Sequence, residues 1–234
     1  MKVYWAPLDN AEINLDLAYY EPNRLSSNIP NHLKNSAYYR CPAFLETVRN
    51  TFVLKSPINL KFKIHPGQNQ YQSDNNNLFQ TKVRFEDAVN HSIGQFGFNY
   101  LIFSEKPLTF TQIHPYLHHN SFTSNGNSLL GEFDCGRWLR PLQSAFVLDS
   151  SKQIYEYDIK RGDAYSYIKF NTDKKIEMVR FEVTPAIENI VGSCLQMKQA
   201  GTGRPFSLDK CYNQFIIHRR RQVILSEIKK QGKL

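Results

Sequence analysis

The sequence predicts a mainly β fold: an antiparallel β-sandwich, jelly-roll-like, over residues 1–183, followed by a helical extension over residues 184–234. Short runs of alternating apolar and polar residues recur about every 8–12 residues, separated by Gly, Pro, Asn and Ser, which is typical of sandwiches and jelly rolls. After Val183 the apolar residues recur every three or four positions, which is the period of an amphipathic helix. The 41% hydrophobic content in 234 residues is enough for a substantial core.

The first half of the predicted sandwich consists of short strands joined by polar connections. Pro42 fits the first position of a helix and predicts a short helical segment there. The polar segments 67–77 and 120–128 are expected to be surface loops. The strands are expected at residues 2–8, 51–64, 81–89, 99–105 and 108–114, and the short helix at 41–50.

Residues 131–181 hold the densest aromatic and paired-charge content of the chain, and the rest of the predicted fold is organised around them. They predict four successive strands joined by tight turns. In the segment QIYEYDIKRGDAYSYIKFNT, Gly162 suits the tip of a hairpin because glycine adopts positive φ readily. Alternation then places Phe170 on the core side and Tyr165 and Tyr167 on the opposite, wetter side of the returning strand.

Two helices are predicted in the C-terminal extension. Thr184 followed by Pro185 is a helix start, because a capping hydroxyl and a proline at the first position both favour it. Ser207 caps the second helix in the same way. The helices are expected at 185–199 and 207–230, and the apolar face of the second begins with Leu208, Cys211, Tyr212 and Phe215.

Several functional classes are excluded by motifs that the sequence lacks. No apolar run approaches the ~18 residues of a membrane span, and the N-terminal residues lack the apolar core of a signal peptide, so we expect a cytoplasmic protein with no membrane partner. The four scattered cysteines predict buried, reduced thiols. No GxGxxG, Walker loop, GxSxG or HExxH motif is present.

The segment GEFDCGRWLRP is the first candidate site. Arg137 and Arg140 flank Trp138, and the guanidinium fork matches carboxylates and phosphates, so these residues predict a site for a small anionic ligand or a host protein. Tyr165 and Tyr167 are expected to complete the binding surface. The structural alternative is that Asp134 pairs with one arginine while Trp138 fills the core.

A metal site is the second candidate. His114 and His118 lie four residues apart, and Glu132 or Asp134 would add a carboxylate if the fold brought them together. Two imidazoles and a carboxylate form the facial triad of non-haem Fe(II) enzymes, which makes a cupin-like oxygenase an alternative function. The HxD or HxH pair with which such enzymes begin their ligand set is absent here.

The basic C-terminal end is the third candidate. The formal net charge is +8, and nonspecific nucleic-acid binding is the function that it suggests. Three consecutive arginines spread over more than half of a helix circumference, so they cannot all face one groove. A solvated tail that favours its own helix terminus is the alternative. The cations concerned are Arg219, Arg220, Arg221, Lys229 and Lys230.

The segments GEFDCGRWLRP, IKRGDAYSYIKFNT and CPAFLETVRNTFVLKSP together resemble a family of uncharacterised proteins from tailed phages, especially marine ones, which share a GEFDxGxWxRP…GD…YxF pattern. The resemblance covers most of residues 35–185. It implies a phage origin and an accessory role in the host cytoplasm, and it carries over no catalytic residue. The first functional hypothesis is therefore a non-enzymatic phage accessory protein that binds an anionic ligand or a host protein.

Overall fold

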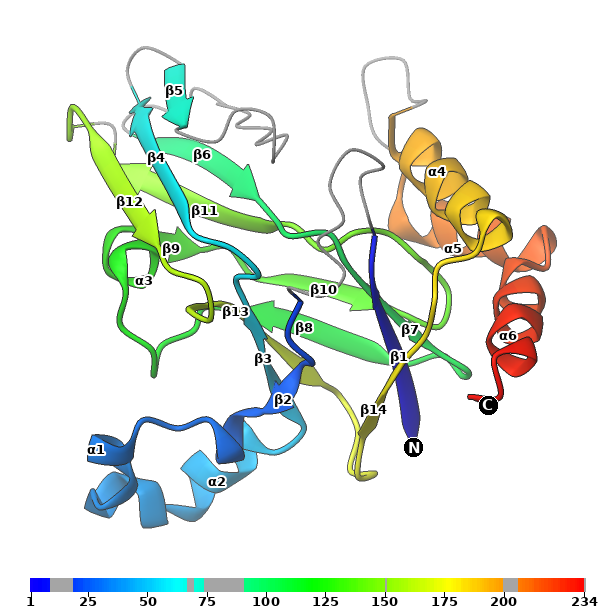
Figure 1. Ribbon diagram of the computed structural model, residues 1–234, viewed down its shortest axis with the longest axis horizontal. Helices are drawn as coiled ribbons and strands as arrows, with labels where there is room; N and C mark the ends of the chain where they lie inside the picture. Colours follow the sequence, from blue (N-terminus) through cyan, green and yellow to red (C-terminus); the bar gives the residue numbers. More distant parts are fainter. Residues whose placement is uncertain (9–18, 67–69, 74–90, 150, 200–205, 234) are drawn as a thin grey trace.

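The computed structural model describes residues 1–8, 19–66, 70–73, 91–149, 151–199 and 206–233. Figure 1 shows a mixed α and β structure in which small sheets are flanked by helices at both ends. Strands take up about 32% and helices 31%, so the expectation of a mainly β fold is corrected to mixed α/β. The described residues form four small sheets, and they show neither a closed barrel nor a clear sandwich.

The bounds of the elements are as follows. The strands are β1 (Lys2–Pro7), β2 (Asn23–Arg24), β3 (Thr51–Lys55), β4 (Leu60–His65), β5 (Gln70–Ser73), β6 (His91–Phe96), β7 (Tyr100–Ser104), β8 (Thr109–Ile113), β9 (Asn127–Ser128), β10 (Gly131–Asp134), β11 (Ser144–Asp149), β12 (Tyr155–Ile159), β13 (Ala164–Phe170) and β14 (Glu177–Arg180). The α-helices are α1 (Asn31–Lys34), α2 (Pro42–Val48), α3 (Ser121–Asn125), α4 (Pro185–Gln199), α5 (Leu208–Ile217) and α6 (Arg220–Lys230), and short 3-10 turns lie at Leu25–Ser27 and Ala37–Arg40.

The sheets have the strand orders β14-β1-β7, β10-β8-β13-β3-β2, β6-β11-β9 and β12-β4-β5. The strand pairs are antiparallel except for β1 and β14, which run parallel. No helix in the described part of residues 1–183 is longer than the seven residues of α2. The turn spacing of the sequence predicts at least seven strands over residues 1–183 with no helix longer than about three turns between them, and the described residues confirm this prediction.

Most of the expected strands of the first half are present, and so is α2, with Pro42 at its first turn. The strand expected at 81–89 lies outside the described residues. Two predicted polar loops are wrong in part: residues 70–73 form β5, which pairs with β4, and residues 121–125 form α3. A capping box explains α3, because the Asn120 side chain accepts hydrogen bonds from two backbone N–H groups and Thr123 Oγ1 accepts one from Asn120 N at 2.9 Å.

The predicted hairpin of residues 155–170 is wrong. β12 pairs with β4, whereas β13 pairs with β3 and β8, so the two strands belong to different sheets. Together, β3–β4 and β12–β13 form a two-stranded ribbon that bends from one sheet into the other at residues 56–59 and 160–163. Ser56 N donates to Asp163 O and Gly162 N donates to Ser56 O, both at 2.8 Å, and Gly162 holds a φ of 90° at the bend.

The central stretch contributes a strand to every sheet. β10 and β13 belong to the five-stranded sheet, and β11, β12 and β14 belong one each to the other three. The stretch therefore holds five strands in place of the predicted four. The stretch runs through all four sheets because none of these five strands pairs with the next one in sequence.

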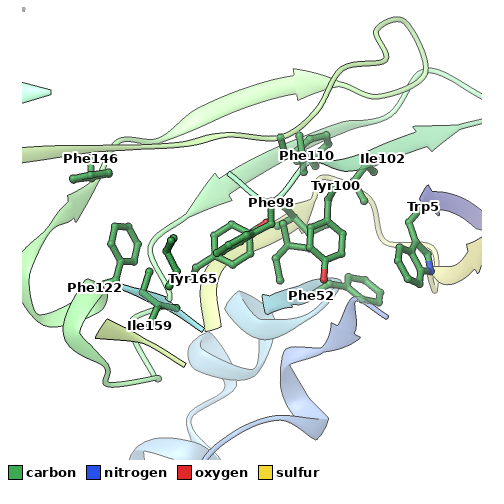
Figure 2. Close-up of a cluster of buried hydrophobic side chains, with 14 of the residues drawn as sticks. Trp5, Phe52, Phe98, Tyr100, Ile102, Phe110, Phe122, Phe146, Ile159 and Tyr165 are labelled. Atoms are coloured by element: carbon green, nitrogen blue, oxygen red, sulfur yellow. The ribbon is translucent and has the colours of Figure 1, made fainter. Parts of the chain in front are cut away.

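The central core lies between the sheets and is rich in aromatic side chains (Figure 2). Figure 2 shows Trp5, Tyr100, Phe110 and Tyr165 among the side chains that fill it. A second core lies between the β14-β1-β7 sheet and helices α4–α6, and a third lies beneath the helices of residues 25–48. The run of buried residues in β1 is explained by this arrangement, because alternate side chains of the strand enter two different cores.

Tyr165 and Tyr167 do not form an exposed face. Both side chains are 0% exposed, so the prediction that they belong to a binding surface is wrong. A β-bulge between Ala164 and Ser166 breaks the alternation of β13. Tyr165 therefore joins Phe170 in the central core, while Tyr167 enters the third core.

The described part of the C-terminal segment forms three helices, whereas the sequence predicts two. Ser207 Oγ accepts a hydrogen bond from Lys210 N at 3.3 Å, which confirms the predicted cap. The second predicted helix is broken at Arg219, which has the left-handed φ of 50° and separates α5 from α6. Leu208 was placed on the apolar face of that helix but is 47% exposed, whereas Tyr212 and Phe215 are buried as predicted.

Two tyrosines on β12 give a matched stability prediction. The Tyr155 hydroxyl donates to Asp149 O at 3.1 Å and accepts from Asp149 N at 3.0 Å. The buried Tyr157 hydroxyl has no hydrogen-bond partner among the described residues. Tyr155→Phe is expected to lower the free energy of unfolding by about 1 kcal/mol, whereas Tyr157→Phe should leave it unchanged or raise it, because an unpaired buried hydroxyl is costly. Urea denaturation of both variants tests this, and a larger loss for Tyr157→Phe would contradict it.

Candidate anion-binding site

The candidate site is built on residues 133–140, which we call the Asp134 loop, and on the α5 side chains that pack against it. β10 ends at Asp134, where the strand pairs with Thr109 of β8. The chain then turns away from the sheet, and Arg137 N donates to Asp134 O at 3.2 Å. This turn directs the loop toward the C-terminal helices.

The Asp134 carboxylate fixes the loop from inside. It is 2% exposed, and its Oδ1 accepts hydrogen bonds from Leu108 N at 3.1 Å and Gly136 N at 2.9 Å. Its Oδ2 accepts from Arg137 Nε at 2.6 Å. Because both oxygens are occupied, the carboxylate is a structural anchor and is not available to a ligand.

Gly136 and Cys135 hold the loop close to the segment that precedes β8. A Cβ on Gly136 would lie 2.2 Å from the backbone oxygen of Lys106, so glycine is required by close approach. Cys135 N donates to Leu108 O at 2.9 Å. Arg221 of α6 donates from Nε to Gly136 O at 2.9 Å, which ties the last helix to the loop.

Arg137 and Trp138 have structural roles: Arg137 pairs with Asp134, and Trp138 fills a core, as the structural alternative for this segment predicts. Arg137 pairs with Asp134, and its guanidinium carbon lies 4.9 Å from the centre of the Tyr212 ring. Trp138 is 5% exposed and meets Tyr212 edge to face at 6.4 Å. Tyr212 also accepts a hydrogen bond from Asp134 N at 2.9 Å, so one α5 side chain contacts three positions of the loop.

Arg140 differs from Arg137. Its side chain is only partly exposed, and its guanidinium carbon lies 4.3 Å from the centre of the Phe133 ring. Within the described residues it makes no hydrogen bond and no ion pair. Burial lowers the pKa of Arg140, and the nearby Tyr212 and Cys211 oppose the shift. The expectation that one arginine pairs with Asp134 is confirmed, and that arginine is Arg137, not Arg140.

The other titratable groups around the loop are held in unreactive forms. Burial raises the pKa of the Cys135 thiol to about 12 and also raises the pKa of Cys211. The pKa of the Tyr212 hydroxyl is raised by burial as well. Near neutral pH these groups are protonated, so the site offers cations and neutral donors but no thiolate nucleophile.

The three predicted metal ligands make separate contacts. His114 Nδ1 lies 3.0 Å from Ser128 Oγ, and His118 Nδ1 is hydrogen-bonded to the Tyr167 hydroxyl. Burial lowers the pKa of both histidines. Glu132 Oε2 accepts from Asn171 Nδ2 at 3.1 Å. The described residues contain no group of three or more His, Cys, Asp or Glu side chains that could hold a metal ion.

The predicted basic cluster spreads in different directions, as consecutive positions of a helix must. Arg219 and Lys229 are exposed, whereas Arg220 lies against α4, with its NH1 nitrogen 3.9 Å from Met197 Sδ. Arg221 faces the Asp134 loop. Lys230 pairs with Glu227 at 2.6 Å on the surface. No single surface gathers all five cations.

Comparisons of the chain with protein-family models, with curated proteins and with solved structures found no match. Within the described ranges, none of the helices has the length and hydropathy that a membrane crossing needs.

Proposed function

We propose that this protein is a non-enzymatic binding module that holds a small anionic ligand at Arg140. The observation that carries the proposal is the partly buried Arg140 guanidinium, which stacks on Phe133 and has no anionic partner among the described residues. A cation withdrawn from water is costly unless an anion compensates it. A bound carboxylate or phosphate would supply that compensation.

The geometry around Arg140 suits an oxyanion. The ring of Phe133 covers one face of the guanidinium. The N–H edge of a guanidinium group can donate two parallel hydrogen bonds to an oxyanion. Arg140 and Lys210 of α5 both lower the pKa of the Cys211 thiol against the effect of its burial, which is consistent with positive charge on this side of the loop. The neighbouring carboxylate, Asp134, is already saturated by Arg137 and backbone N–H groups.

Burial raises the pKa of the neighbouring thiols and of the Tyr212 hydroxyl, so these groups offer no ionised nucleophile beside an anion bound at Arg140. An acidic side chain or phosphate on a host protein offers the same chemistry as a free anion.

Under this proposal the resemblance to tailed-phage proteins would make the module a phage accessory protein. A jelly-roll-like arrangement of its sheets belongs to the same proposal, supported by the ribbon that bends between two sheets.

Thermal unfolding in inorganic phosphate, compared with chloride at equal ionic strength, tests the proposal. Phosphate is expected to raise the Tm of the wild-type protein, because a ligand that binds only the folded state stabilises it. Arg140→Gln should abolish this rise. Arg161→Gln is the matched control, because Arg161 also lies over an aromatic ring, Tyr20, but is exposed.

Without added anion, Arg140→Gln is expected to change the Tm by less than about 2 °C, because the substitution removes a desolvated cation that has no ion-pair partner. Two results would overturn the proposal. One is a phosphate effect of equal size in Arg140→Gln and wild type. The other is a large loss of stability in Arg140→Gln together with no phosphate effect in the wild type, which would assign Arg140 a packing role.

A further inference from the structure

The corner between α5 and α6, residues 216–223, lies at an outer edge of the molecule (Figure 1). Three of its aliphatic side chains are exposed. Ile216 is 47% exposed, Ile217 is 67% exposed and Val223 is 40% exposed. We call this surface the α5–α6 corner. Side chains of this kind at one corner are unusual, because large aliphatic residues are generally buried.

The segment that forms the corner carries charge of one sign. The sequence contains no Asp or Glu between Asp209 and Glu227, whereas Arg219, Arg220 and Arg221 lie within that interval. Arg220 and Arg221 are turned toward α4 and the Asp134 loop. Arg219 is the exposed arginine of the corner, and its guanidinium makes no hydrogen bond or ion pair within the described residues.

The backbone at Arg219 gives a second, independent observation. Its φ of 50° and ψ of 28° lie in the left-handed region, where a side chain costs about 1 kcal/mol relative to glycine. Its side chain does not cap α6. An arginine thus occupies a position where glycine would be easier for the fold, and its charge has no internal use in the described structure.

We propose that the α5–α6 corner contacts an anionic phospholipid surface, with Ile216, Ile217 and Val223 entering the interface and Arg219 facing the headgroups. Aliphatic side chains bordered by cations are the composition of peripheral membrane-binding surfaces. Such contact needs no membrane-spanning helix. It also goes beyond the anion site, because the corner is a different surface.

Other occupants fit the corner less well. A second copy of the chain would bring like charges together at a symmetric contact. A specific protein partner buries roughly 800 Å² on each side, far more than three partly exposed aliphatic side chains provide. A lipid surface needs no complementary shape and presents negative charge over the whole corner.

Co-sedimentation with vesicles tests the proposal. The wild-type protein is expected to bind vesicles of equimolar phosphatidylcholine and phosphatidylglycerol and not vesicles of phosphatidylcholine alone. Ile217→Ser should weaken this binding by about tenfold or more, because a buried isoleucine is worth roughly 1.5–3 kcal/mol. Leu130→Ser is the matched control, because Leu130 is 71% exposed but lies between β9 and β10.

Arg219→Gly separates binding from folding. The substitution should weaken vesicle binding by about fivefold, because that is the contribution of one cation to binding at an anionic surface. The Tm should stay the same or rise. Duplex DNA serves as a polyanion control, on which Ile217→Ser should have no effect. The proposal is overturned if the wild type does not bind anionic vesicles, or if Ile217→Ser binds them as well as the wild type. Binding to an acidic amphipathic peptide without binding to vesicles would also overturn it and assign the corner to a protein partner.

Discussion

Asp134→Ala is expected to lower the free energy of unfolding by about 3–5 kcal/mol, and hence the Tm by roughly 10 °C for a chain of this length. The substitution leaves two buried backbone N–H groups, those of Leu108 and Gly136, without an acceptor. It also removes the partner of Arg137. Unpaired buried donors each cost about 1–3 kcal/mol, and they account for most of the loss.

Two further variants distinguish the causes of that loss. Arg137→Gln should cost less, because Arg137 is 36% exposed in its side chain and Asp134 keeps its backbone donors. Glu132→Ala is the control on the same strand, and because this carboxylate is exposed its loss should stay within about 0.5 kcal/mol. Urea denaturation measures all three. A loss for Asp134→Ala no greater than that for Glu132→Ala would show that the carboxylate does not anchor the loop.

The local signals in the sequence predicted where elements lie, but not which elements meet. Pro42 and Ser207 marked helix starts correctly, because capping depends on residues only a few positions apart. The capping box from Asn120 to Thr123 was equally local, and it predicts α3 once it is recognised. Strand pairing depends on distant residues, which is why β12 and β13 were expected to form a hairpin.

In the candidate site too, contacts between residues close in sequence could be predicted and contacts between distant residues could not. The Asp134 ion pair follows from a turn in which Gly136 N donates to Asp134 Oδ1, and such Asx turns can be recognised in a sequence. That turn also favours Arg137, three residues on, as the partner. Tyr212 could not be assigned to the site, because its contact with Asp134 N joins residues 78 positions apart.

The bulge in β13 explains the error about the tyrosines. A regular strand would place Tyr165 and Tyr167 on one side, and the sequence contains no proline or glycine there to mark an irregularity. The extra residue sends the two rings into different cores. Both faces of the strand are buried because the helices of residues 25–48 cover the face that alternation assigned to water.

Ile224→Ala and Ile228→Ala are each expected to lower the free energy of unfolding by about 2–5 kcal/mol. Both isoleucines are 0% exposed and belong to the core that α6 shares with the β14-β1-β7 sheet. Each truncation leaves a cavity that the surrounding helices can only partly close. Val223→Ala, on the same helix but 40% exposed, is the matched control and should cost less than about 0.5 kcal/mol.

A chain that lacks residues 218–234 would lose part of the same core. The basic character of this segment suggests a tail that could be removed without unfolding the rest, but its loss would expose apolar side chains of the core that α6 shares with α4, α5 and the β14-β1-β7 sheet. The shortened chain is therefore expected to lose cooperative unfolding or to aggregate, which circular dichroism and size-exclusion chromatography would show. A cooperative transition at the wild-type Tm, in the truncated chain or in an Ile224→Ala and Ile228→Ala double variant, would contradict the packing of α6 on the sheet. Val223→Ala, measured under the same conditions, controls for helix propensity in the isoleucine variants. Alanine is the stronger helix former, so a change in propensity alone would not lower their stability.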